Sequence, residues 1–258
     1  MNSFDRSGAG RRNAFQLDRY CWLHIRKTEA RVKLKEYRKK RQFDVTPEPR
    51  GAGNIREKGK ESLIYVVQKH MASHLHYDFR LEWRGVLLSW AVPKGPSLDP
   101  GVKRLATQTE DHPVEYANFE GIIPEGQYGA GTVMLWDRGT WQPETPDVDA
   151  SLQKGEMKFT LYGKKLQGSW VLVRIRGFGS NPSRSNWLLI KHRDQYASTK
   201  DVTLEEPRSV ASHRLLADIA RGDGGDIAKA SMGDSGDDAR RTTTTKSVRG
   251  RIKRKRQP

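Results

Sequence analysis

The chain has 258 residues, a formal net charge of +16 and a pI near 10.0. This length suits one domain of ordinary size with flanking segments, and the charge favours a polyanionic partner, nucleic acid before a membrane surface. A single cysteine, Cys21, excludes an intrachain disulfide framework and a cysteine-based zinc cluster. Met1–Ala14 lacks the apolar core of a signal peptide, and apolar runs such as Trp170–Val173 are too short to span a bilayer. We therefore expect a soluble, cytoplasmic protein.

The first sixty residues predict at most one helix. Residues 1–27 could form a short helix or a flexible arm, and the sequence leaves both open. Residues 28–41 contain good helix formers and neither Gly nor Pro, but little apolar surface, which indicates a basic surface helix. The Pro- and Gly-bearing segment 46–51 ends this helix, and a charged loop is expected over residues 50–61.

From Leu63 onward, short segments of strand character alternate with turn signals, and helical periodicity is almost absent. The expected strands are Leu63–Gln68, Leu75–Trp83, Val86–Val92, Leu105–Glu110, Thr132–Trp136, Glu156–Tyr162, Ser169–Arg176 and Asn186–Lys191. About eight short strands of this kind predict an all-β fold, either a barrel or a sandwich. The tryptophans at 90, 136, 141 and 170 are expected to fill its core.

No aromatic residue follows Tyr196. Residues 201–258 are rich in Ala, Gly, Asp and Ser, and their end is a run of Lys and Arg. Such a composition buries too little apolar area to offset its ordering entropy, so we expect a disordered basic tail, with room for a short helix at Val210–Ala220. The chain is thus divided into a basic extension (1–36), a β-domain (37–200) and a tail (201–258).

The stretch from Gln68 to Glu82 carries the chemistry. From Leu75 it alternates, so that His76, Asp78, Arg80 and Glu82 would share one face of a strand with an apolar back. Side chains on one face lie about 6.5–7 Å apart, close enough for His76 and Asp78 to share an ion, and His70 could fold back toward them. A solvated strand face is the plain alternative. His74 has the parity of His76, but we expect it not to be a ligand.

Two imidazoles and one carboxylate suit a divalent transition metal and leave positions for water and substrate. The planar guanidinium of Arg80 matches phosphate oxygens. The same set could be the facial triad of a non-haem Fe(II) oxygenase, with His192 as a downstream ligand. A third interpretation is a non-catalytic, basic DNA-binding module. Arg80, His112 and Lys94 together with the basic charge favour phosphate chemistry.

Several longer motifs occur in a fixed order. They are Gln68-Lys69-His70, Leu75–Glu82, Ser89–Pro96, Glu110–Pro113, Tyr116, Phe119–Gly121, Ile123-Pro124, Tyr128-Gly129, Gly131–Val133, Trp136-Asp137, Gly168–Arg174 and Leu188–Asp194. Together they resemble the 3′-phosphoesterase domain of the bacterial end-joining DNA ligase D family, which also occurs as a stand-alone protein. The resemblance extends from about Tyr37 to Ala197.

This resemblance implies a compact closed β-barrel that binds a divalent metal, most often Mn²⁺, with Zn²⁺ or Co²⁺ as alternatives. It implies an enzyme that removes 3′-terminal ribonucleosides and 3′-phosphates from a DNA primer–template and leaves a 3′-hydroxyl. The ligase and polymerase domains of the large enzymes are missing from this chain, so any sealing is expected from separate partners. We expect a monomer associated with the nucleoid.

The same resemblance places functional positions on individual residues. The metal-ligand positions are His70, His76 and Asp78; the phosphate-contacting positions are Arg80, His112 and Tyr116; the supporting positions are Gln68, Lys94, Arg104 and Glu110; and Arg41 and Glu48 are further functional positions. The family pattern Arg-Asp-Phe is here Arg41-Gln42-Phe43, so a carboxylate is missing at 42. Apart from these positions, the basic runs at 31–41 and 249–256 are expected to be solvated surface, with nonspecific attraction to DNA second.

Overall fold

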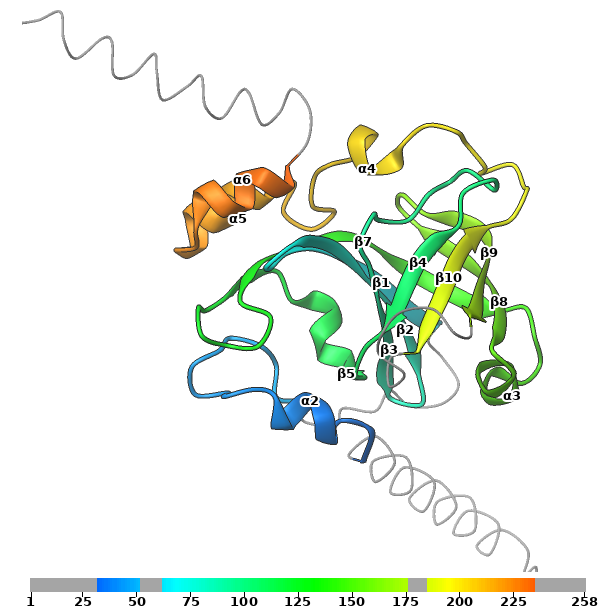
Figure 1. Ribbon diagram of the computed structural model, residues 1–258, viewed down its shortest axis with the longest axis horizontal. Helices are drawn as coiled ribbons and strands as arrows, with labels where there is room; N and C mark the ends of the chain where they lie inside the picture. Colours follow the sequence, from blue (N-terminus) through cyan, green and yellow to red (C-terminus); the bar gives the residue numbers. More distant parts are fainter. Residues whose placement is uncertain (1–31, 52–61, 176–184, 235–258) are drawn as a thin grey trace, which may run out of the picture.

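The fold is described from a computed structural model, which covers residues 32–51, 62–175 and 185–234 (Figure 1). The expected arm at 1–27, all but the first two residues of the expected loop at 50–61, and the basic run at 249–256 lie outside these residues. Among the described residues, no helix is both long enough and apolar enough to cross a membrane.

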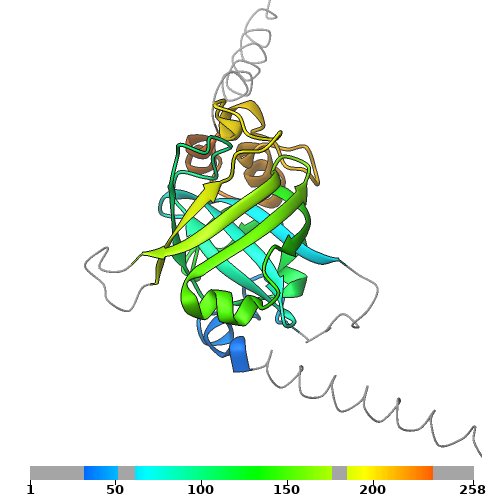
Figure 2. The same ribbon diagram turned by 90° about the vertical axis from the view of Figure 1, so that its right-hand side faces the viewer.

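Ten strands form one antiparallel sheet. They are β1 (Leu63–Met71), β2 (Leu75–Trp83), β3 (Val86–Val92), β4 (Arg104–Gln108), β5 (His112–Pro113), β6 (Gly121–Ile123), β7 (Gly131–Pro143), β8 (Glu156–Gly163), β9 (Gln167–Ile175) and β10 (Asn186–Lys191). The order β1-β2-β3-β4-β10-β9-β8-β7 closes on itself because β1 also pairs with β7 (Figure 2). The prediction of a closed β-barrel is therefore confirmed. The short strands β5 and β6, which we did not predict, pair with β3 and β7 outside this circle.

The hairpin of β2 and β3 has the bounds that its sequence predicts. Arg84 and Gly85 connect the strands with φ values of 49° and 77°, and positive φ at both central residues is what a type I′ turn requires. This turn fixes the register, in which Asp78 lies opposite Ala91 and Arg80 opposite Ser89. The polar face of β2 is thereby aligned with small residues of β3, which leaves space above it.

The other face of the same strands packs into the core. The tryptophans at 90, 136, 141, 170 and 187 are at most 1% exposed, and Phe79 and Phe159 lie between them with ring centroids 5.8 Å apart. The polar face of β2 is also buried: Asp78, Arg80 and Glu82 are each less than 10% exposed. The plain alternative of a solvated strand face is therefore wrong.

The helices of the described residues are all short. They are α2 (Lys35–Lys39), the 3₁₀ helix η1 (Val114–Asn118), α3 (Val148–Lys154), α4 (Val202–Glu205), α5 (Leu216–Asp223) and α6 (Ile227–Gly233). In both views α2 lies toward the bottom of the molecule and the pair α5–α6 lies higher, well separated from α2 (Figures 1 and 2). The segment before the barrel is more than a solvated surface helix, because Leu34 and Tyr37 are buried and Tyr37 donates a hydrogen bond to the Pro49 carbonyl at 2.7 Å.

The prediction of a disordered tail from residue 201 is wrong for residues 201–234. Helices α5 and α6 contact β6, β7 and β1, and they bury Leu216, Ile219 and Ala230. The Asp234 carboxylate accepts hydrogen bonds from the Leu216 and Ala217 amides at 3.0 and 2.9 Å and so caps α5. This segment is poor in apolar residues, but its few apolar side chains meet the end of an existing barrel.

Candidate active site

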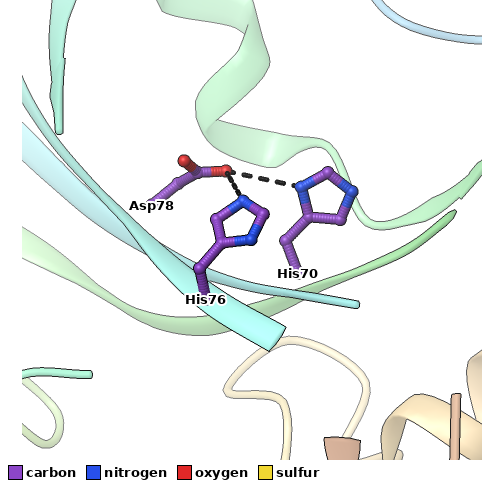
Figure 3. Close-up of side chains that lie close together, drawn as sticks. All are labelled: His70, His76 and Asp78. Carbon is purple, nitrogen blue, oxygen red and sulfur yellow. Dashed lines mark ion pairs between the residues drawn. The ribbon is translucent and has the colours of Figure 1, made fainter. Parts of the chain in front are cut away.

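Three side chains from neighbouring strands converge at one point. His70 on β1 lies directly opposite His76 on β2, so their side chains share a face of the sheet with Asp78 (Figure 3). The Asp78 Oδ2 atom is 3.6 Å from His70 Nδ1 and 3.8 Å from His76 Nε2, and one potential ligand atom from each residue lies within 4.8 Å of the others. The group could therefore hold a metal ion.

Backbone carbonyls orient both imidazoles. His70 Nε2 lies 2.9 Å from the Gly129 carbonyl oxygen, and His76 Nδ1 lies 3.0 Å from the His74 carbonyl oxygen. Because a carbonyl can only accept, each of these nitrogens carries the ring proton. The lone pairs of His70 Nδ1 and His76 Nε2 then face Asp78. A neutral imidazole whose far nitrogen donates to a carbonyl is the arrangement that metal-binding histidines adopt.

The Asp78 carboxylate is ionised. Burial alone would raise its pKa, but the Arg80 guanidinium, with Nη2 3.1 Å from Oδ2, together with the imidazoles of His70 and His76, holds the pKa well below its usual range. The cluster thus offers one carboxylate oxygen and two imidazole nitrogens as ligands. This nitrogen and oxygen donor set fits a divalent transition-metal cation.

Arg80 joins the cluster to the rest of the site. Its Nε donates to Gln68 Oε1 at 2.9 Å and its Nη1 donates to Ser89 Oγ at 2.8 Å. Gln68 in turn donates through Nε2 to the carbonyls of Tyr116 and Phe119, at 3.1 and 2.8 Å. The guanidinium is therefore held rigidly, with its plane fixed by β1, β3 and the η1 segment.

His112 lies between two guanidinium groups. Its Nε2 is 3.2 Å from Arg41 Nη2, and its Nδ1 is 2.9 Å from both Arg80 Nη1 and the Glu110 carbonyl oxygen. Burial lowers the pKa of His112 well below its usual value, and the charges of Arg80 and Arg41 lower it further. The imidazole is consequently neutral at neutral pH.

The segment before the barrel, which contains Arg41 and Glu48, packs over the site. Arg41 donates through Nε to Glu48 Oε1 at 2.8 Å, and its Nη1 lies 3.3 Å from Glu110 Oε1. The Tyr116 hydroxyl also donates to Glu48 Oε1, at 3.0 Å. Burial, followed by the charge of Glu48, raises the pKa of Tyr116 well above its usual value, so the phenol stays protonated. The structure thus brings Arg41 and Glu48 next to His112 and Tyr116.

A pocket of about 430 Å³ lies in the middle of these side chains. Its lining includes His70, His76, Asp78, Arg80, His112, Tyr116, Arg41 and Glu110. The formal charges of Arg41 and Arg80 cancel those of Asp78 and Glu110. A divalent cation would bring the pocket to a net charge of +2, which matches the charge of about −1.5 to −2 on a phosphate monoester at neutral pH.

Two of the predicted site residues do not line this pocket. Lys94 is exposed in the loop after β3, and Arg104 begins β4; neither lines the pocket. The side chain of Gln42 is exposed and does not line it either. His192, the downstream ligand of the oxygenase interpretation, lies 2.7 Å from Ser169 Oγ through its Nδ1 and is not part of the metal-ligand group.

Other residues of the site were not singled out from the sequence. Lys40 Nζ binds Glu110 Oε2 at 2.9 Å, Ser89 binds Arg80, and Tyr128 stands at the edge of the pocket. Lys40 is in the basic run that we expected to be solvated. The motifs Ser89–Pro96 and Tyr128-Gly129 contain two of these positions, but neither motif carried a chemical signal for them.

Comparison with known proteins agrees with this geometry. Residues 68–174 match the DNA Ligase D 3′-phosphoesterase domain. The chain is 53% identical over 189 residues to the multifunctional non-homologous end joining protein LigD of Pseudomonas aeruginosa, which covers 71% of this chain and 22% of that protein. It is 44% identical over 152 residues to the LigD protein of Mycobacterium tuberculosis. These residues cover 56% of this chain and 19% of that protein. The chain therefore spans about a fifth of the length of these relatives, and it belongs to the DNA ligase D 3′-phosphoesterase domain family.

Proposed function

We propose that this protein is a metal-dependent DNA 3′-end-processing phosphoesterase. The observation that carries the proposal is that a group suited to a metal and a group suited to a phosphate lie in one pocket. A group suited to a metal, His70, His76 and Asp78, lies beside the guanidinium and imidazole groups of Arg80, His112 and Arg41. Metal ligands alone would fit many enzymes, and guanidinium and imidazole groups alone would fit a phosphate-binding module.

The substrate would be a DNA primer strand that ends in a 3′-phosphate or a 3′-terminal ribonucleotide. In the first reaction water attacks phosphorus, the bond between phosphorus and the 3′-oxygen breaks, and that oxygen leaves with a proton as a 3′-hydroxyl. In the second, water attacks phosphorus, the bond from phosphorus to the 5′-oxygen of the terminal ribonucleoside breaks, the ribonucleoside leaves with a protonated 5′-hydroxyl, and a 3′-phosphate remains. The names of the relatives place them in non-homologous end joining, so we assign this chain the same process, with a separate ligase and polymerase as partners.

His70, His76 and Asp78 would hold the metal, which we expect to be Mn²⁺. When bound, such an ion withdraws charge from phosphate oxygens as the transition state forms. Arg80 is placed to bind further phosphate oxygens, and Gln68 keeps its plane fixed. Because His112 is neutral and its ring nitrogens lie within hydrogen-bond distance of Arg41 and Arg80, we assign it the positioning of these guanidinium groups against the phosphate rather than proton donation. Arg41, Glu48 and Tyr116 would hold His112 and the roof of the pocket.

The test uses a primer–template with a 3′-phosphate, Mn²⁺, and matched reactions with a chelator. We expect a 3′-hydroxyl product, detected by extension with a DNA polymerase, that disappears when the chelator is present. Product that is undiminished by the chelator, or no product with any divalent metal, would overturn the proposal.

The metal site is tested separately by metal content after dialysis. His76→Ala should lose the bound Mn²⁺, because it removes one of three ligands. His74→Ala is the matched control, since it removes an imidazole two residues away whose side chain is not part of the group. Equal metal content in both variants would show that the ligands are assigned wrongly.

A further inference from the structure

A second hollow adjoins the metal pocket. It has a volume of about 600 Å³ and shares Ser73, His76, Ala91, Thr109, Glu110 and Tyr128 with that pocket. From there it extends past Thr107 and Pro93 on one side and past Lys40 and Glu36 on the other. Its far end is lined by the exposed residues Glu36, His74 and Pro93, so it opens to the surface. We call it the exit groove.

Tyr128 stands where the exit groove meets the metal pocket. Its side chain is 52% exposed, one of the few large apolar side chains of the described residues that remain so open. The ring is nevertheless held in place, because Lys40 Nζ lies 4.5 Å from its centroid and 3.4 Å from its hydroxyl. Lys40 is itself bound to Glu110 Oε2 at 2.9 Å. An exposed aromatic ring is thus fixed beside an ammonium group at the edge of the site.

This combination suits a nucleoside attached to a phosphate. The aromatic face can stack on any base, and the ammonium group can bind the phosphate on the same nucleotide or on the next one. An open groove is also what a continuing strand requires, whereas a closed cavity would suit a released nucleoside. The hollow on the other side of the pocket shares only Ile123 with it, and it is lined by Glu125, Asp223 and Asp226 and by no aromatic ring.

Resting on the proposed function, we propose that the exit groove binds the nucleoside that bears the 3′-phosphate, with its base stacked on Tyr128. The primer strand then leaves toward Pro93 and His74. Stacking recognises the face of a base and not its edge, so the enzyme should accept all four bases at this position. Lys40 is a positioning residue in this arrangement, because it fixes the ring.

The experiment compares two 3′-phosphate primer–templates. One has a normal terminal nucleoside, and the other has a stable tetrahydrofuran analogue that lacks only the base. Tyr128→Ala should lower kcat/KM about 5- to 160-fold on the first substrate, the range expected for loss of one base–aromatic stack, and should change it little on the second. Tyr128→Phe keeps the ring and should retain most of the rate. Tyr162→Ala is the matched control, because Tyr162 is also 52% exposed and lines neither hollow.

A binding measurement without metal makes the result independent of turnover. In chelator, fluorescence anisotropy should show that Tyr128→Ala weakens binding of the base-bearing primer–template more than binding of the abasic one. Equal losses on both substrates, or no loss on either, would overturn the stacking proposal. If the wild-type protein releases no phosphate with any metal while the base-dependent binding loss remains, the proposed function fails and the exit groove stands.

Discussion

At the scale of single residues, the site depends on groups that are tied to partners outside it. The Gly129 carbonyl selects the tautomer of His70, and a substituted Cβ at Gly129 would lie 3.6 Å from the His70 ring. The Glu48 carboxylate, which is fully buried, holds Arg41 and Tyr116 at once. Buried charges of this kind are tolerated because each has an opposite charge and hydrogen bonds. A buried carboxylate that is less well paired should lower the free energy of unfolding by a measurable amount.

Asp111 is such a residue. Burial, with a smaller contribution from the charge of the neighbouring Glu110 and against the attraction of Lys33, raises its pKa to about 6. Between the unfolded pKa near 3.8 and about 6, the folded state binds more protons than the unfolded state, so stability falls as pH rises through this window. Asp111→Asn should therefore raise the free energy of unfolding by about 1–3 kcal/mol at pH 8, since one pKa unit corresponds to roughly 1.4 kcal/mol.

Urea unfolding of both proteins at pH 4 and pH 8 measures this difference. The gain should be largest at pH 8 and should shrink toward pH 4, where the native carboxyl is itself protonated. Asp44→Asn is the control, because Asp44 is in an exposed ion pair with Arg50 and should change stability little at either pH. A gain from Asp111→Asn that is the same at both pH values would contradict the assigned cause.

At the scale of elements, residues 201–234 behave as part of the barrel domain. The Trp136 indole donates to the Glu206 carbonyl at 2.7 Å, and the Val210 amide donates to the Leu135 carbonyl at 2.9 Å. Glu120 accepts hydrogen bonds from both the Leu135 amide and the Ser209 hydroxyl. The segment thus completes the hydrogen bonding of β7, next to the strand that carries His70.

Two truncations separate this segment from the residues beyond it. Removal of 207–258 would expose the apolar surface now covered by Leu216 and Ile219, each worth about 1.5–3 kcal/mol when fully buried. We expect the Tm to fall by about 10 °C or more, because 1 kcal/mol shifts Tm by roughly 2–4 °C in a domain of this size. Removal of 235–258 should leave the Tm nearly unchanged. Differential scanning calorimetry gives the answer, and equal Tm values for both truncations would mean that the helices add nothing to stability.

At the scale of the whole molecule, the charge of +16 is unevenly distributed along the chain. Residues 235–258 contain nine Lys and Arg residues and two Asp residues, whereas the pocket itself is close to neutral. Charge outside the pocket should therefore attract the DNA backbone, while the pocket selects its end. The two contributions can be measured separately because they depend differently on salt.

We predict that removal of 235–258 weakens binding of a primer–template mainly at low salt. Each lost contact to a phosphate should reduce the slope of log K against log[salt] by about 0.9. The value of kcat at saturating DNA should stay nearly the same, because these residues are remote in sequence from every residue of the pocket. Titrations at several salt concentrations measure the slope. An unchanged slope, or a collapse of kcat at saturation, would show that this charge has another role.

The sequence alone determined the local parts of this protein. The alternation of Leu75–Trp83 and the turn at Arg84-Gly85 predicted the bounds of β2 and β3, because side-chain parity and turn geometry depend only on neighbouring residues. The same alternation put His76, Asp78 and Arg80 on one face. The family resemblance added His112, Tyr116, Arg41 and Glu48, which no local pattern connects.

Only the tertiary structure decided how distant segments meet. It paired β1 with β7 and so closed the barrel, placed Arg41 3.2 Å from His112 across 71 positions of sequence, and left Lys94 and Arg104 outside the pocket. It also ordered residues 201–234, whose composition predicts disorder when the segment is considered by itself. The physical reason is the same in each case: these contacts gain their free energy from surfaces that other parts of the chain provide, and a local sequence pattern contains no record of those surfaces.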